Sequence, residues 1–494
     1  MSEQLAANRP TIKILLYTDD PQVSPTDHLG EFLGLGSMIE RLNQHAPTFA
    51  DLNIKWISRS TDSSNHANNR IDDVLAQEAQ TGEPFDEIWF FGLHQANTEK
   101  FSLGAFRGGP DSELDAAEVA ALQQWMGTEN GSHGGGVLMT GDHANASPPK
   151  LLATPNSPCG DTSASADFLG LGRAIGRCVP RAGLLRRWEG PPTHRDQDSF
   201  NTIGKSGFQV DRIPQTLHLR KLNSDGDPDN NGMPHPLFFY GPEQFIEAFP
   251  DHQHEGAVII PSDFEGWPIG PKGQTQPHVV ATGIDPRNDQ PLNILATYNG
   301  DLTGVGRIVS DSTWHHYMNL NLRGFPHPAP KGSPSDQIGQ FYGNLAIWLA
   351  PRNKRIQMAR AMCWQLARFT LLLQERSDPE TIGNFAHSVL GESTSPCEIH
   401  ELLQVLPPLE SGGFPAATVP GSNDQPSREL FLGVVLDAYH QTMIQAETEN
   451  QLAANGPQEN SVDKLIEVCF RRTFDEHEKR LRRDLEAIVN KKTK

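Results

Sequence analysis

The 494-residue sequence lacks several features that would place it in a specialised class of protein. No apolar run approaches the roughly 20 residues that a bilayer-spanning helix needs. The N-terminus has no basic segment followed by an apolar core, so we expect no signal peptide. The five cysteines are scattered, odd in number and without a CxxC pair, which argues against a disulfide framework and a thiolate zinc site. We therefore expect a soluble, cytoplasmic protein.

Positive charge is scarce as well. The chain has 41 Lys and Arg residues against 61 Asp and Glu residues, and its formal net charge is -20. Such a charge repels phosphate backbones, so we expect neither a nucleic-acid nor a membrane partner. The basic stretch 479–494 is typical of a solvated helix face.

Common catalytic motifs are also missing. The sequence contains no GxSxG elbow, no HExxH pair and no Walker A loop. Residues 170–176 imitate a dinucleotide fingerprint, but no predicted strand precedes them and their spacing is wrong. None of these motifs therefore identifies an active centre.

Alternating apolar strands and amphipathic helices dominate the first 350 residues. Strands are predicted at 12–17, 52–58, 87–93, 137–140, 257–260, 278–282, 292–298 and 306–311. Helices are predicted at 31–44, 71–80, from 112 onward and at 336–349. This alternation predicts an α/β fold with a mostly parallel sheet and helices on both faces.

The length suggests two or three domains, and the shifts in composition lead us to assign two. We assign residues 1–350 to the α/β domain. Residues 145–256 are interpreted as an irregular insertion, because 145–235 are rich in Pro, Gly, Asn and Asp. A short strand at 216–220 is one exception within it. Residues 351–494 form a helical C-terminal domain, with helices predicted at 353–375, 379–390, 397–405, 427–448 and 461–490.

The order of these elements resembles the class I glutamine amidotransferase-like superfamily. The segment 292–311 (LNILATYNGDLTGVGRIVSD) is similar to the strand, turn and G-x-G-R-hydrophobic hairpin of its ThuA-like branch. The resemblance implies a flavodoxin-like sheet. That superfamily's nucleophilic Cys would follow the fourth strand, where this chain reads Thr140-Gly-Asp-His-Ala144. We therefore do not expect a Cys-dependent glutaminase.

Polar side chains follow four of the predicted strands. Ligands of open parallel sheets bind outside the carboxyl ends of the strands, so these residues would converge there if their strands were adjacent. An Asp or His after a single strand is often only an N-cap or turn former, but the recurrence at four strands favours a functional crevice. The candidate catalytic residues are His94, Asp142, His143, His315 and His316, with Asp19, Asp20 and Asp311 orienting imidazoles or completing a ligand shell.

A second group of acids and imidazoles lies in the stretch 250–256 (PDHQHEG). It is either a polar loop or a lid that adds ligands or a general base to the crevice. Imidazoles and carboxylates together would suit a divalent metal such as Zn²⁺, Mn²⁺ or Fe²⁺. The candidate metal ligands are Asp20, His143, His252, His254, Glu255, Asp311 and His315.

Two classes of function fit this pattern. The first is a hydrolase-type enzyme, metal-assisted if a metal is bound, that acts on a small-molecule substrate at the carboxyl edge of the sheet. The alternative is a non-catalytic ligand-binding or scaffold protein. Its helical C-terminal region would recruit a protein partner or mediate self-association, through the amphipathic stretch around residues 465–488.

Overall fold

The computed structural model describes part of the chain, which forms two compact units. One unit holds Thr11–Lys354 together with Ser395–Glu398. The other holds Arg355–Thr394, the described residues from Ile399 onward and those before Thr11. The described residues are 9–18, 23–25, 34–59, 68–91, 116–127, 134–140, 185–187, 214–223, 229–241, 244–250, 257–259, 269–270, 273–274, 277–285, 290–311, 315–322, 325, 328–367, 379–405, 433 and 436.

An eight-stranded sheet forms the centre of the larger unit, in the order β2-β1-β3-β4-β18-β17-β16-β7. The five strands from β2 to β18 are parallel, and the last three pair antiparallel. The parallel part has the 2-1-3-4-5 order of flavodoxin-like sheets and is consistent with that fold. The strands are β1 (Thr11–Thr18), β2 (Asp51–Ser58), β3 (Glu87–Phe91), β4 (Gly136–Met139), β7 (His218–Leu219), β16 (His278–Asp285), β17 (Gln290–Tyr298) and β18 (Ile308–Asp311).

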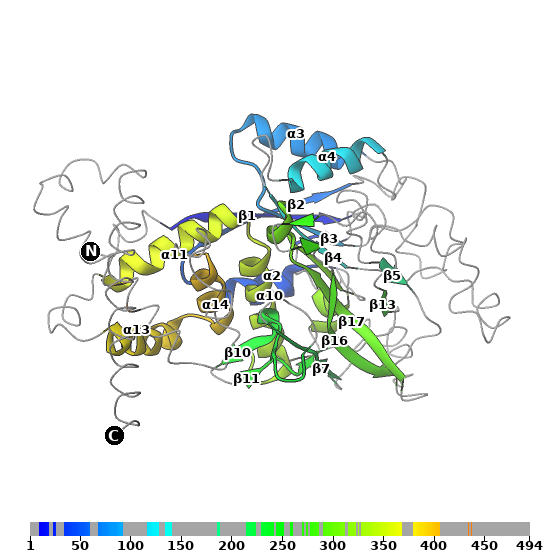
Figure 1. Ribbon diagram of the computed structural model, residues 1–494. Helices are drawn as coiled ribbons and strands as arrows, with labels where there is room; N and C mark the ends of the chain where they lie inside the picture. Colours follow the sequence, from blue (N-terminus) through cyan, green and yellow to red (C-terminus); the bar gives the residue numbers. More distant parts are fainter. Residues whose placement is uncertain are drawn as a thin grey trace, which may run out of the picture. The chain divides into compact units, whose positions relative to one another are not determined.

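Helices cover both faces of this sheet (Figure 1). On one face lie α3 (Ile71–Gln80) and α4 (Ala116–Met126), and on the other lie α2 (Gly36–Gln44) and α10 (Pro334–Leu349). The predicted α/β class, with a mostly parallel sheet, is therefore confirmed. A short helix α9 (Asn319–Leu322) precedes α10.

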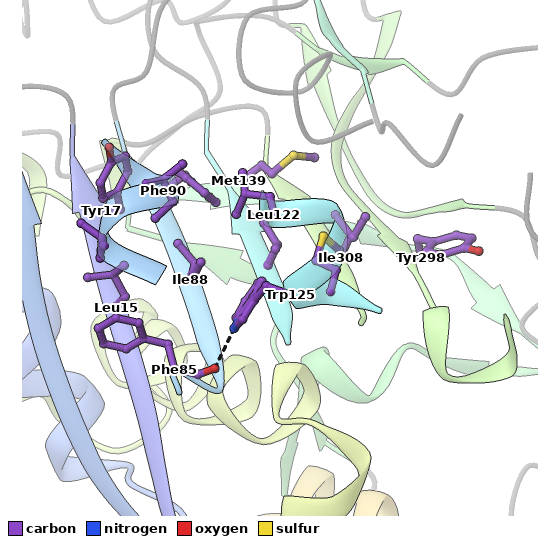
Figure 2. Packing of buried hydrophobic residues seen from close by; sticks show 14 of the residues in the cluster. Leu15, Tyr17, Phe85, Ile88, Phe90, Leu122, Trp125, Met139, Tyr298 and Ile308 are labelled. Atoms are coloured by element: carbon purple, nitrogen blue, oxygen red, sulfur yellow. Dashed lines mark hydrogen bonds between the residues drawn. The ribbon is translucent and has the colours of Figure 1, made fainter. Parts of the chain in front are cut away.

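The core under α3 and α4 follows from the alternation of side chains along the strands. Leu15, Ile88 and Phe90 point to this face and pack against Leu122 of α4 (Figure 2). The indole of Trp125 fills the end of the layer, and its Nε1 donates to the backbone oxygen of Phe85 at 2.9 Å. This bond satisfies the one polar atom that the ring carries into the core.

The described part of the predicted insertion, and the residues that follow it up to 274, contain mainly short strands. β5 (Leu185–Arg187) pairs with β13 (Ala257–Ile259), β12 (Ala248–Phe249) pairs with β6 (Gln215–Thr216), and β7 joins the edge of the central sheet. The predicted strand at 216–220 is thus divided between β6 and β7. The remaining short elements are β8 (Lys221–Leu222), β9 (Met233–Pro234), η2 (Pro236–Phe238), β10 (Phe239–Gly241), β11 (Gln244–Phe245), β14 (Ile269–Gly270) and β15 (Gly273–Gln274).

The helix α2 begins later than its hydrophobic pattern predicts. Leu35 has a non-helical backbone, and its N–H donates to the oxygen of Ser24 at 2.7 Å. The N–H of Ser37 is satisfied by Oδ1 of Asn319 at 2.8 Å. A side chain from far along the chain therefore takes the place of a local cap at this helix end.

The smaller unit is helical where it is described. Its helices are α13 (Pro379–Ser393) and most of both α11 (Arg352–Ala367) and α14 (Pro396–Gln404). The buried side chains of Arg355 and Glu401 form an ion pair with an N–O distance of 3.2 Å. Within the described ranges, no helix has the length and apolar character that crossing a membrane requires.

Candidate functional site

The carboxyl ends of four parallel strands lie next to one another in the sheet. Thr18 at the end of β1 pairs with Phe91 at the end of β3. Met139 at the end of β4 lies between Phe90 of β3 and Ser310 of β18. The strands β1, β3, β4 and β18 are the ones whose ends lead into acids and imidazoles, so the adjacency that the site requires is present.

Most of the predicted site residues are outside the described residues. His315 is the first residue of the turn η4 (His315–Tyr317), and its side chain also lies outside the described part. Two candidates have described side chains, Asp311 and His316. The candidates outside the described residues are Asp19, Asp20, His94, Asp142, His143, His252, His254 and Glu255.

The structure brings Asp311 and His316 into direct contact. Asp311 is the last residue of β18, and η4 returns the chain so that Nε2 of His316 lies 2.7 Å from Oδ2 of Asp311. Both side chains are buried, with relative exposures of 0% and 1%. The spacing of five residues across a strand end thus creates a carboxylate–imidazole pair at the carboxyl edge.

Two tyrosines complete this polar group. Tyr317 donates its hydroxyl to Oδ2 of Asp311 at 3.0 Å, and Tyr342 of α10 donates to the backbone oxygen of His316. Burial raises the pKa of Tyr317 well above its usual value, and the charge of Asp311 raises it further. Burial also raises the pKa of Tyr342, against the opposing charge of Arg41. Both hydroxyls therefore keep their protons and act as donors.

Aromatic rings enclose the imidazole. The ring of Phe249, on β12, lies 4.6 Å from that of His316, and the ring of Tyr317 lies 4.7 Å away on its own turn. Phe91 at the end of β3 contacts Tyr317 edge to face at 5.4 Å. These rings lower the local dielectric constant, which strengthens the interaction between Asp311 and His316.

A second charged group at the same edge was missed in the sequence. Arg59, directly after β2, makes two contacts with Glu118 in the first turn of α4, at 2.5 and 3.0 Å. The carboxylate also accepts the N–H of Ile71 at 3.2 Å. Burial raises the pKa of the neighbouring Tyr17, whose hydroxyl donates to Asn69. The sequence does show an Arg directly after a predicted strand. No local pattern, however, identifies Glu118, which is 59 residues away, as its partner.

The described residues do not gather a metal site by themselves. Within the described part of the chain, no group of three His, Cys, Asp or Glu side chains could hold a metal ion. Oδ2 of Asp311 accepts a hydrogen bond from the hydroxyl of Tyr317 and lies 2.7 Å from Nε2 of His316, so in this arrangement it contacts protein groups. The other six candidate ligands have side chains outside the described residues.

The fold and this edge define an α/β protein with an open sheet and a buried carboxylate–imidazole pair at the carboxyl ends of its strands. Comparisons of the chain with models of protein families, with curated proteins and with solved structures give no match. Fold alone does not determine function, so the function must be inferred from the chain's own residues.

Proposed function

We propose that the protein is a hydrolase-type enzyme whose reaction takes place at the carboxyl edge of the central sheet. One observation carries the proposal: the four strands that lead into acids and imidazoles are adjacent and parallel. Open α/β sheets bind their ligands at this edge. The position of the buried Asp311–His316 pair at the same edge supports the proposal.

The pair is suited to acid–base chemistry. An imidazole that contacts a buried carboxylate is held in one orientation, and the carboxylate stabilises the imidazolium that forms when a proton is accepted. In a hydrolysis, His316 would take a proton from the attacking water and return it to the leaving group. The substrate class that we propose is a small amide, an ester or a sugar derivative.

The resemblance to the ThuA-like branch of the amidotransferase-like superfamily stands as part of this proposal. The strand order 2-1-3-4-5 and the antiparallel hairpin formed by β17 and β18 support it. The residue at the end of the fourth strand is Thr140, whose Oγ1 donates to the backbone oxygen of Phe90 at 3.0 Å. The chemistry proposed here therefore does not use a cysteine at that place.

A substrate screen tests the catalytic proposal. The full-length protein is assayed against a panel of small amides, esters and glycosides, together with His316→Gln and Asp311→Asn variants. We expect both substitutions to lower kcat by about 100-fold or more, as the loss of a general acid–base group does.

His45→Gln is the matched control. His45 also contacts an aspartate, with Nε2 3.4 Å from Oδ1 of Asp336, but it lies at the C-terminal end of α2. This variant should keep full activity. Unchanged turnover in His316→Gln would contradict the proposal, and binding of a small molecule without turnover would favour a non-catalytic ligand-binding protein.

A divalent metal at this edge is a separate part of the proposal. Elemental analysis of the purified protein should find Zn, Mn or Fe near one equivalent if the predicted ligands assemble. His143→Ala and His315→Ala should then abolish the metal content, whereas His45→Ala should not. Metal that stays bound in both site variants would contradict the proposed ligand set.

A further inference from the structure

The hydrogen bonds around Asp311 determine which nitrogen of His316 carries a proton. One carboxylate oxygen, Oδ2, faces both Nε2 of His316 at 2.7 Å and the hydroxyl of Tyr317 at 3.0 Å. An ionised carboxylate can only accept hydrogen bonds. If Nε2 of His316 carries a proton, then both Nε2 and the Tyr317 hydroxyl donate hydrogen bonds to Oδ2 of Asp311, which accepts them.

The opposite arrangement is disfavoured by the same geometry. If neutral His316 carried its proton on Nδ1, the Nε2 lone pair would face an anionic oxygen at 2.7 Å in a site where neither side chain is more than 1% exposed. Two acceptors that face each other in such a buried position, with no proton between them, carry a large energetic cost. The Tyr317 hydroxyl already donates to Oδ2 at 3.0 Å, so this oxygen acts as an acceptor in the group.

The other ring nitrogen of His316, Nδ1, differs from Nε2 in its surroundings. Within the described residues, no group hydrogen-bonds to Nδ1. The rings of Phe249 and Tyr317 restrict the imidazole plane, and the Tyr342 hydroxyl binds the backbone oxygen of His316. Nδ1 is therefore the ring nitrogen that can accept a proton from outside this group.

We infer that Tyr317 is a positioning residue which, together with Asp311, holds the proton of neutral His316 on Nε2 and makes Nδ1 the basic atom of the site. This inference rests on the proposed function and states which nitrogen of His316 takes part in the proton transfer. As the attacking water bonds to the substrate's electrophilic centre, its O–H bond breaks and the proton joins Nδ1. The imidazolium then returns this proton to the leaving group as the scissile bond breaks.

The tautomer can be measured without any substrate. The full-length protein is labelled with ¹⁵N-histidine, and long-range ¹H–¹⁵N spectra are recorded at alkaline pH, where imidazoles are neutral. His316→Gln identifies the resonances of His316. We expect a protonated Nε2 and an unprotonated Nδ1 in the wild type, and the reverse pattern would overturn the inference.

Tyr317→Phe tests the positioning role. The substitution keeps the ring that contacts Phe91 and removes only the hydroxyl bonded to Asp311. We expect His316 to become a mixture of the two tautomers. Tyr342→Phe is the matched control, because it also removes a buried tyrosine hydroxyl but one that binds the backbone of His316. It should lose stability and keep the single Nε2-H tautomer.

The outcomes separate this inference from the proposed function. A single tautomer in Tyr317→Phe would show that Tyr317 has only a structural role. If a substrate is turned over, Tyr317→Phe should lower kcat by about 10- to 100-fold with little change in KM, by analogy with the loss of hydrogen-bond partners of metal-ligating side chains. A wild-type Nε2-H tautomer in a protein that hydrolyses nothing would refute the enzyme and leave the tautomer assignment intact.

Discussion

Glu87 is an acidic residue whose side chain is fully buried in the described core. It lies on β3 with no solvent exposure. Its Oε2 accepts the indole N–H of Trp89 at 2.8 Å, and no described residue hydrogen-bonds to Oε1. Burial raises the pKa of Glu87 well above its usual value, against the hydrogen bond from Trp89. The group therefore favours its neutral form in the folded state.

This shift makes stability depend on pH in a defined direction. Between the unfolded-state pKa of about 4.3 and the raised folded-state pKa, the native state binds more protons than the unfolded state. Stability therefore falls as the pH rises through this window. Glu87→Gln removes the ionisation and keeps the shape, so its stability advantage over the wild type should grow with pH. Urea denaturation midpoints measured from acidic to alkaline pH check this.

An exposed glutamate provides the comparison for Glu87. Glu247→Gln changes the same functional group at an exposed position and should follow the wild-type curve within about 0.5 kcal/mol at every pH. Parallel curves for Glu87→Gln and the wild type would show that Glu87 does not contribute to the pH dependence.

At the scale of elements, the hairpin of β17 and β18 depends on close backbone contacts. A Cβ atom on Gly306 would lie 1.8 Å from the backbone oxygen of Gly135, which directly precedes β4. Arg307 next to it donates to the Trp348 oxygen at 2.9 Å and pairs with Asp301 at 3.0 Å. These contacts align β18, and therefore Asp311 at its end, with β4.

Gly306→Ala should destabilise the protein strongly because the added methyl group meets rigid backbone. We expect a loss of about 3 kcal/mol, at the upper end of overpacking effects, measured by denaturant unfolding. Gly391→Ala is the control, since a Cβ at that exposed helical position meets nothing within 4 Å. It should be neutral or stabilising by up to about 1 kcal/mol. Equal effects of the two substitutions would disprove the role of the close contact.

The strand β12 places Phe249 over the imidazole of His316. The ring is 1% exposed, and it lies 4.6 Å from His316 and 4.9 Å from Phe341 of α10. The backbone N–H of Glu247 donates to Oε1 of Gln337 at 3.1 Å and holds the strand on the same helix. Access of solvent to His316 should therefore depend on Phe249.

Phe249→Ala should speed hydrogen–deuterium exchange at the imidazole C2 position of His316, measured by mass spectrometry. The substitution should also cost about 3 kcal/mol of stability, as for other buried phenylalanines. Phe245→Ala is the control, because that ring contacts Phe239 at 6.0 Å instead. His235 serves as an internal reference, and equal acceleration at His235 would indicate global loosening in place of local opening.

Several elements could be predicted from hydrophobic spacing alone. The helix α3 has the predicted bounds, and β2 differs by one residue, because each has a local pattern of apolar residues at a clear period. The delayed start of α2 could not be predicted, since its cap comes from Asn319. The antiparallel pairing of β16 and β7 was also missed, because alternation identifies the buried face of a strand and not its neighbour.

The site was predictable only to the level of strand ends. Asp311 and His316 were both candidates, but their contact depends on the turn η4 and could not be deduced from their spacing. The pair of Arg59 and Glu118 was missed altogether, because its partners lie on different elements. Interactions across the fold depend on the packing of whole elements, which a local pattern does not contain.

At the scale of the whole molecule, a late segment of the chain completes the sheet-containing unit. Residues Ser395–Glu398 belong to the same compact unit as Thr11–Lys354. The carboxylate of Glu398, 1% exposed, accepts the backbone N–H groups of Thr48 and Phe49 at 2.8 and 2.9 Å. These donors come just before β2, so the turn entering β2 depends on a residue about 350 positions later.

Glu398→Ala should therefore destabilise the unit that contains the sheet, although the residue lies beyond residue 350. It leaves two backbone donors without their charged acceptor, and each unsatisfied buried group costs about 1 to 3 kcal/mol. We expect a loss of about 3 kcal/mol in denaturant unfolding, followed by the fluorescence of Trp56 on β2. Ser395→Ala removes only the hydroxyl that accepts the N–H of Glu398 at 3.1 Å, and should cost about 1 kcal/mol. The reverse ranking would show that this late segment is not required to hold the turn before β2.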